Sequence, residues 1–92
     1  MKDVVWSSST QVDLVRLHHF LASANPHAAA RLIDQLTAAP ERLRERPRLG
    51  RQLERYGPRD VRRLVVGRYE LQYELRNDDI FVLRIWHGRE DR

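Results

Sequence analysis

The 92-residue chain predicts a single domain and leaves little material for a deep substrate pocket. It contains no cysteine, which excludes disulfide bonds, a thiolate nucleophile and cysteine ligands for zinc, and no apolar run approaches the roughly 20 residues that span a bilayer. The formal net charge is +4, and residues 41–68 hold ten arginines against four acidic residues, so we expect a cytoplasmic protein with an anionic macromolecular partner.

The N-terminal third predicts a strand followed by a helix. Residues 3–7 are short, β-branched and aromatic, which is typical of a strand. The serines and the threonine at positions 7–10 are candidates for a helix N-cap. A helix is predicted from Thr10 to Ala24, because apolar and aromatic residues recur there at helical spacing, namely Leu14, Leu17, His18 and Leu21.

A second helix is predicted from Pro26 to Ala39. Pro26 is tolerated in a first helical turn, and Pro40 is expected to break or kink the helix, after which residues 41–46 could add a short helical turn. The link between the two helices is so short that they should form an antiparallel hairpin. Residues 47–59 contain two prolines and two glycines among polar residues, which predicts a loop.

Three strand signals follow the loop, at Val61–Val66, Tyr69–Arg76 and Ile80–His87. The middle strand alternates cleanly, which predicts a solvated polar face and an apolar face made of Tyr69, Leu71, Tyr73 and Leu75. The same alternation in the last strand puts Phe81, Leu83 and Ile85 on one face and places on the other Ile80, Val82, Arg84 and Trp86.

The expected fold is therefore α+β, with the order β-α-α-β-β-β in one domain over residues 1–92. The helix hairpin should cover one face of an antiparallel sheet, because both the helices and the strands have an apolar side to bury. The opposite face should be at least partly polar and open.

Arginine is the residue type that could give this open face its chemistry. Arg62, Arg84 and Arg89 are expected to share it, where such a cluster could bind phosphates. His87 follows the last strand beside carboxylates and could act as an acid or a base, as could Tyr56, Tyr69 or Tyr73. No metal-ligand spacing and no glycine-rich phosphate loop is present, so we expect neither a metal nor a cofactor.

Two segments of the C-terminal half resemble the closing strands of the RelE/ParE toxin superfamily. They are LVVGRYELQYEL at residues 64–75 and IFVLRIWHGRED at residues 80–91. The loop at residues 47–50, of the form Pro-x-Leu-Gly, and the order of the elements are similar to that superfamily as well. The resemblance covers essentially the whole chain and implies the toxin of a type II toxin–antitoxin pair.

The superfamily has two branches with different targets. RelE-like members cleave mRNA on the ribosome, whereas ParE-like members inhibit DNA gyrase and have no accepted nuclease activity. The RelE pattern has a basic residue after the tyrosine that opens the central strand, where this chain has Glu70 after Tyr69, and it has a C-terminal tyrosine that this chain lacks. Arg89 could supply the basic residue expected after the last strand. These departures make the chain more similar to the ParE-like branch.

The resemblance implies a ParE-like gyrase inhibitor, without enzymatic activity, that a cognate antitoxin neutralises in a heterotetramer or larger complex. The alternative is a RelE-like endoribonuclease that needs the ribosome and mRNA, with Arg84, His87 and Arg89 as catalytic candidates. A binding module that has lost its toxicity is a third reading. An acidic antitoxin segment is expected to fold as a helix on the domain. The residues expected to bind the target are Arg62, Arg84, Trp86, His87 and Arg89.

Overall fold

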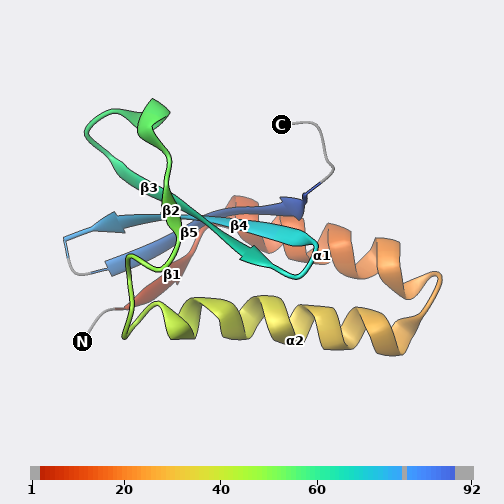
Figure 1. Cartoon of the computed structure of the whole chain (residues 1–92). Coiled ribbons are helices and arrows are strands. Elements are labelled where there is room, and N and C mark those ends of the chain that lie inside the picture. Colours follow the sequence, from red (N-terminus) through yellow and green to blue (C-terminus); the bar gives the residue numbers. More distant parts are fainter. Residues whose placement is uncertain (1–2, 78, 89–92) are drawn as a thin grey trace.

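The structure is a computed structural model that describes residues 3–77 and 79–88. Figure 1 shows a helix hairpin lying against a twisted sheet. The predicted α+β order is confirmed, with one short strand added inside the predicted loop. Neither described helix is both long enough and apolar enough to cross a bilayer. The elements in chain order are β1 (Val4–Trp6), α1 (Ser8–Ala22), α2 (Pro26–Arg42), β2 (Arg51–Gln52), the 3₁₀ helix η1 (Glu54–Tyr56), β3 (Asp60–Val66), β4 (Tyr69–Arg76) and β5 (Asp79–His87).

The sheet has five strands in the order β1-β5-β4-β3-β2. The meander of β3, β4 and β5 is antiparallel, as predicted. The sheet as a whole is mixed rather than antiparallel, because β1 pairs with β5 in parallel, with Val4 opposite Ile80. Two parallel neighbours need a long crossover between them, and the helix hairpin together with β2, β3 and β4 provides it.

Helix α1 begins two residues before the predicted Thr10. Ser7 is its N-cap, and the Ser7 Oγ accepts a hydrogen bond from the Thr10 N–H at 3.0 Å. The sequence offered three adjacent serines as caps, so composition alone did not distinguish the first of them. The helix ends at Ala22, two residues before the predicted Ala24.

Helix α2 begins at Pro26, as predicted, and Asn25 caps it by accepting a hydrogen bond from the Ala28 N–H at 3.1 Å. The predicted end at Ala39 was wrong, since α2 continues through Pro40 to Arg42. Pro40 lies in the last turn, where its missing N–H costs one helical hydrogen bond. Its ring is fully buried, and this burial offsets that cost.

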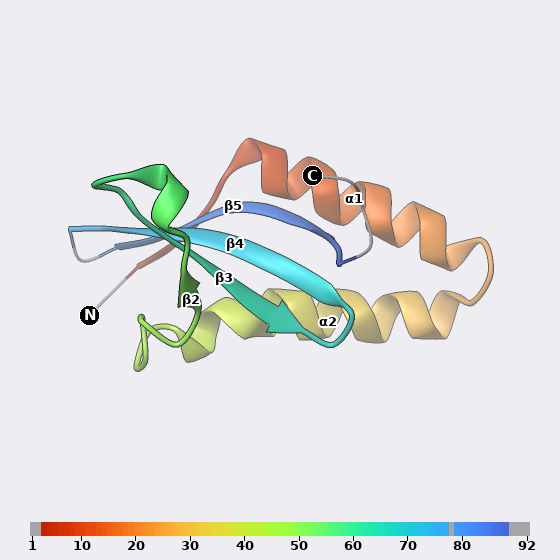
Figure 2. The same ribbon diagram turned by 45° about the horizontal axis from the view of Figure 1, so that its top comes forward.

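The hydrophobic core lies between the helix hairpin and one face of the sheet, which we call the inner face (Figure 2). The opposite face is called the outer face. Both helices contribute to the core, so the predicted burial of the hairpin against the sheet is confirmed. The buried core residues are Leu17, Leu36, Ala39, Leu43, Leu64, Val66, Leu71, Tyr73, Ile80, Val82 and Ile85.

A β-bulge in β5 changes which side chains face the core. Tyr73 of β4 pairs with Val82, whereas the preceding Gln72 pairs with Arg84, so Leu83 is an extra residue in β5. Val82 and Ile85 are consequently both buried in the core, although they are three residues apart. The prediction of strict alternation along this strand was wrong for that reason.

Candidate functional site

The edge of β5 beyond β1 is closed by polar side chains of α1 and of its N-cap residue Ser7 rather than by another strand. The Thr10 Oγ1 donates a hydrogen bond to the Val82 carbonyl at 2.9 Å, and the Ser7 Oγ donates to the Leu83 carbonyl at 3.0 Å. The Asp13 Oδ2 accepts a hydrogen bond from the Ile85 N–H at 2.9 Å. Side chains one helical turn apart therefore satisfy consecutive backbone groups at the bulge, which fixes α1 against the strand.

Asp13 also binds Arg84 at this edge. The Arg84 Nε lies 2.8 Å from the Asp13 Oδ2, and one terminal nitrogen lies 3.2 Å from the Oδ1, which makes the contact bidentate. The Asp13 side chain is only 4% exposed, whereas that of Arg84 is 51% exposed. The guanidinium is therefore held in place while half of its surface stays open to a partner.

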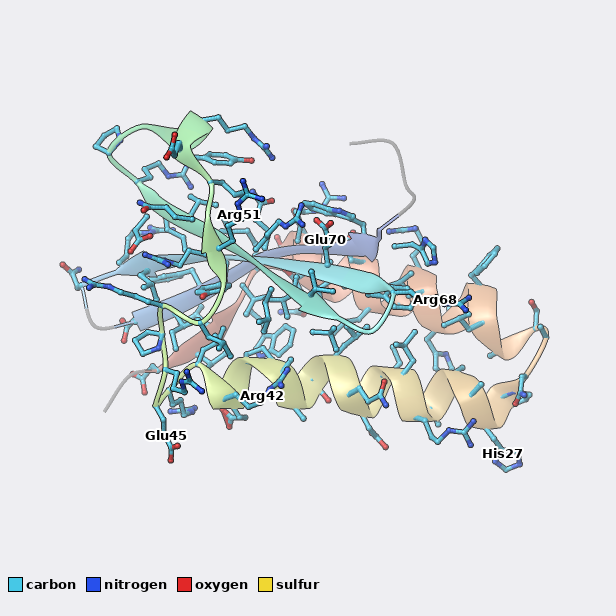
Figure 3. The ribbon with its side chains drawn as sticks, viewed as in Figure 1. His27, Arg42, Glu45, Arg51, Arg68 and Glu70 are labelled. Atoms are coloured by element: carbon cyan, nitrogen blue, oxygen red, sulfur yellow. The ribbon has the colours of Figure 1, made fainter. Side chains whose placement is uncertain are left out.

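The outer face is built from residues that lie opposite one another across β3, β4 and β5. Arg63, Gln72 and Arg84 form one such row. Val65, Glu70 and Trp86 form the next. Figure 3 shows the Glu70 and Arg51 side chains on the side of the sheet away from α2.

The outer face of β4 is buried, so the prediction of a solvated polar face was wrong. Glu70, Gln72 and Glu74 are 7%, 5% and 3% exposed. They are covered because arginines of neighbouring segments lie against them, including Arg63, which contacts Glu70 at 3.4 Å. A buried carboxylate needs such a partner, since leaving it unpaired would cost several kcal/mol.

Arg59, from the loop before β3, makes the best of these contacts. Its Nε and one terminal nitrogen donate to the two Glu74 carboxylate oxygens at 3.0 and 2.8 Å. Arg76 adds a contact to Glu74 at 3.3 Å. The hydrogen bond from Arg59 holds the pKa of Glu74 below its usual value, against the opposing effect of burial, and the same bond raises the pKa of Arg59.

Tyr56 of η1 is a titratable group on the outer face that several neighbouring side chains contact. Its hydroxyl accepts a hydrogen bond from the Gln72 Nε2 at 2.7 Å. The guanidinium carbons of Arg55 and Arg59 lie 5.1 and 5.8 Å from the centre of its ring. The hydrogen bond from Gln72, followed by the effect of Arg55, lowers the pKa of Tyr56. The sequence included Tyr56 among several tyrosines but gave no reason to prefer it.

Arg62 does not share the outer face, contrary to the prediction. It lies opposite Tyr73 of β4, on the inner side of the sheet. Its Nε pairs with Asp60 at 2.9 Å, and one terminal nitrogen donates to the carbonyls of Gly50 at 3.0 Å and Arg48 at 3.3 Å. The Arg62 side chain is only 13% exposed, so it holds the loop after α2 rather than facing a partner.

The other predicted site residues fall into two groups. Trp86 lies on the outer face opposite Glu70, in the row next to that of Arg84. His87 lies opposite Tyr69 on the inner side, with the two rings edge to face at 5.1 Å. The structure therefore separates His87 from Arg84, which had been grouped as catalytic candidates. Arg89 lies outside the described residues.

Arginines and buried carboxylates form ion pairs on the outer face. Arg59, Arg63, Arg76 and Arg84 each contact a buried carboxylate within 4.0 Å. Within residues 3–77 and 79–88, no group of histidines and carboxylates could hold a metal ion. The four arginines share three carboxylates, Glu74, Glu70 and Asp13, which offset part of their positive charge and hold the guanidinium groups in fixed positions.

Comparisons with known proteins agree with this architecture. The family model of the ParE toxin of the type II toxin–antitoxin system parDE matches residues 4–92. Toxin RelE1 of Caulobacter vibrioides is 37% identical over 93 residues, covering 97% of this chain and 96% of the relative. Toxin RelE3 of the same organism is 32% identical over 96 residues, covering both chains completely.

Among solved structures, a chain of the chromosomal ParDE TA system from P. aeruginosa superposes with a TM-score of 0.76. The match covers 95% of this chain and 96% of that chain at 19% sequence identity. At this level of identity the likeness concerns the fold.

Proposed function

The chain belongs to the ParE toxin family of type II toxin–antitoxin systems, and from this we propose that it inhibits DNA gyrase and is neutralised by a cognate antitoxin. The family implies the toxin role and the antitoxin partner, and the choice of gyrase as the target is our proposal. The observation that carries this choice is the pairing of the outer-face arginines with buried carboxylates.

An endoribonuclease must stabilise the negative charge that develops on a phosphate as the RNA backbone breaks. Arg63 and Arg84 lie in one row on the outer face, and Glu70 and Asp13 already contact them. Glu70 would also repel a phosphate placed over the centre of the sheet. The outer face is therefore better suited to a protein surface, for which Arg84 and Trp86 are the anchors that we propose.

A supercoiling assay with purified full-length toxin and gyrase tests the proposal. We expect micromolar toxin to inhibit supercoiling and Arg84→Met to weaken the inhibition about tenfold or more, as is typical of an interface anchor. Arg48→Met is a matched control, because Arg48 is exposed on the loop after α2 and its side chain makes no ion pair with the described residues. Unaffected gyrase at micromolar toxin would refute the proposal.

A RelE-like endoribonuclease is the second candidate, and two observations favour it. The curated relatives are named RelE1 and RelE3. In addition, the pKa of Tyr56 is lowered by the hydrogen bond from Gln72 and by Arg55, whose guanidinium carbon lies 5.1 Å from the centre of the tyrosine ring. A tyrosine in such a position could transfer a proton during RNA cleavage.

Toeprinting on translating ribosomes distinguishes the two candidates. If this second candidate is correct, purified toxin cuts mRNA in the ribosomal A site, and Tyr56→Phe reduces the cutting at a temperature at which thermal melts show the variant to be folded. Absence of new cleavage sites at a toxin concentration that stops growth would exclude it.

A further inference from the structure

The end of the outer face formed by β2 and η1 differs in charge from its centre. Arg51 of β2 and Arg55 of η1 are exposed, and neither forms an ion pair with another residue in the described part of the chain. Arg59 differs, because it contacts the buried carboxylate of Glu74 at 2.8 Å. Residues 51–59 hold three arginines against one acidic residue. This end of the outer face therefore has positive charge that is available to an anionic partner.

Strand register brings Arg51 onto the same side of the sheet as Gln72. Arg51 lies opposite Arg63 across β2 and β3, and Arg63 lies opposite Gln72 across β3 and β4. Residues that lie directly opposite each other in neighbouring strands have their side chains on one face. Figure 3 shows the Arg51 side chain on the side of the sheet away from α2. The backbone of Arg51 is therefore about 10 Å, or two strand spacings, from that of Gln72.

Gln72 places the Tyr56 hydroxyl over this part of the face. Gln72 is only 5% exposed, and its Nε2 donates a hydrogen bond to the Tyr56 hydroxyl at 2.7 Å. Because the hydroxyl oxygen accepts this bond, its own hydrogen remains for another acceptor. Arg55 lies beside the same ring, with its guanidinium carbon 5.1 Å from the ring centre. A hydroxyl donor and two guanidinium groups are thus gathered where an anion could accept hydrogen bonds from them.

These groups suit the phosphates of a nucleic acid better than its bases. A guanidinium group binds two phosphate oxygens at once. Binding of a single strand usually requires an aromatic ring on which bases can stack. The guanidinium carbons of Arg55 and Arg59 already lie over the Tyr56 ring, at 5.1 and 5.8 Å from its centre. A duplex, whose bases are stacked on one another and whose phosphates face outward, is therefore the better fit.

We propose that Arg51, Arg55 and Tyr56 form a site for the phosphate backbone of duplex DNA, and that Gln72 positions the Tyr56 hydroxyl in it. The choice of DNA rests on the proposed function, because duplex DNA is the substrate of gyrase. The site is separate from the proposed anchor Arg84, since β3 and β4 lie between β2 and β5. The toxin thus contacts gyrase through β5 and, through η1, the DNA that gyrase holds.

The test measures binding of the full chain to a labelled DNA duplex of about 20 base pairs by fluorescence anisotropy, at salt concentrations of about 50 to 200 mM. Each phosphate contact contributes about −0.9 to the slope of the logarithm of the association constant against the logarithm of the salt concentration. We expect the double variant Arg51→Gln with Arg55→Gln to reduce the size of this slope by about 2. Its binding at the lowest salt concentration should be about tenfold weaker or more.

A matched control is the double variant Arg42→Gln with Arg48→Gln, which loses the same charge from exposed arginines of α2 and the loop after it. Figure 3 shows Arg42 on α2, on the other side of the sheet from Arg51. This variant should keep a slope close to that of wild type, because its arginines lie outside the proposed site.

Tyr56→Phe tests the hydroxyl donor. It removes a neutral group, so binding should weaken about threefold to tenfold while the salt slope stays unchanged. Gln72→Met should weaken binding by a similar factor in the wild-type background and have no further effect when Tyr56 is already replaced. A purely structural role of Gln72 would weaken binding in both backgrounds. Thermal melts establish that each variant is folded at the temperature of the assay.

Four results would overturn the inference. They are no binding of wild type at about 50 mM salt, equal slopes for wild type and the Arg51 and Arg55 variant, tighter binding of single-stranded DNA, and tighter binding of an RNA duplex of the same sequence. The last result would instead favour the endoribonuclease candidate. Gyrase is absent from these measurements, so they can fail while the supercoiling assay succeeds, and the reverse.

Discussion

Asp13→Ala should destabilise the toxin more than any loss of a surface ion pair would. The substitution removes the acceptor of the Ile85 N–H, which is buried and bonded at 2.9 Å. It also removes both contacts to Arg84. At the bulge, the edge of β5 would keep the hydrogen bonds from Ser7 and Thr10 but lose the one that the Ile85 N–H donates.

The magnitude follows from the two kinds of contact. A buried N–H left without a partner costs about 1–3 kcal/mol. The ion pair adds only about 0.5–1 kcal/mol, because the Arg84 side chain is half exposed and its charge is screened by solvent. We therefore expect Asp13→Ala to lower the free energy of unfolding by about 2–4 kcal/mol. Asp13→Asn keeps an oxygen for the Ile85 N–H and should cost about 1 kcal/mol.

Urea denaturation followed by circular dichroism measures these differences. A double-mutant cycle with Arg84→Met separates the two contributions. We expect most of the cost of Asp13→Ala to remain in the Arg84→Met background, because the strand N–H is still left unpaired. Equal stability of Asp13→Ala and Asp13→Asn would refute the reasoning. So would a cost that disappears when Arg84 is replaced.

The remaining predictions concern the outer face and the loop after α2. The lowered pKa of Glu74 contributes stability above its unfolded pKa of about 4.3, and this is lost as the pH falls through the lower folded pKa. Glu74→Gln should therefore lose less stability than wild type in thermal melts from pH 7 to pH 3, and parallel curves would contradict this. Tyr73→Phe removes the hydroxyl that is hydrogen-bonded to Pro47 and Gly50. In urea denaturation, it should lower the free energy of unfolding by about 1–3 kcal/mol, and a loss of under about 0.5 kcal/mol would contradict this. Gly50→Ala places a methyl group 2.8 Å from that hydroxyl and should cost a similar amount by the same assay, whereas an unchanged midpoint would show that the loop can move.

Local patterns in the sequence were sufficient to predict the helices and the meander. The alternation of Tyr69, Leu71, Tyr73 and Leu75 predicted the inner face of β4, and Leu71 and Tyr73 are fully buried there. This worked because a strand has a period of two and one apolar side to bury. The helical spacing around Leu17 and Leu36 similarly predicted a hairpin packed on the sheet.

The candidate site was harder to predict, because it depends on pairings between distant segments. Arg62 and Arg84 have similar sequence surroundings, yet strand register places them on opposite faces. Asp13 and Arg84 are separated by 71 residues, and no local pattern relates them. The burial of Glu74 could not be predicted from alternation, since it depends on Arg59 of a preceding loop lying over β4.

The sequence by itself determined the element order, the core face of β4 and the basic character of residues 41–68, because these depend on periodicity and composition over short stretches. Only the tertiary structure decided the parallel pairing of β1, the bulge at Leu83 and the partner of each arginine. Each of these depends on which backbone and charged groups remain unsatisfied once the core has packed, and that is settled only when segments far apart in the chain meet.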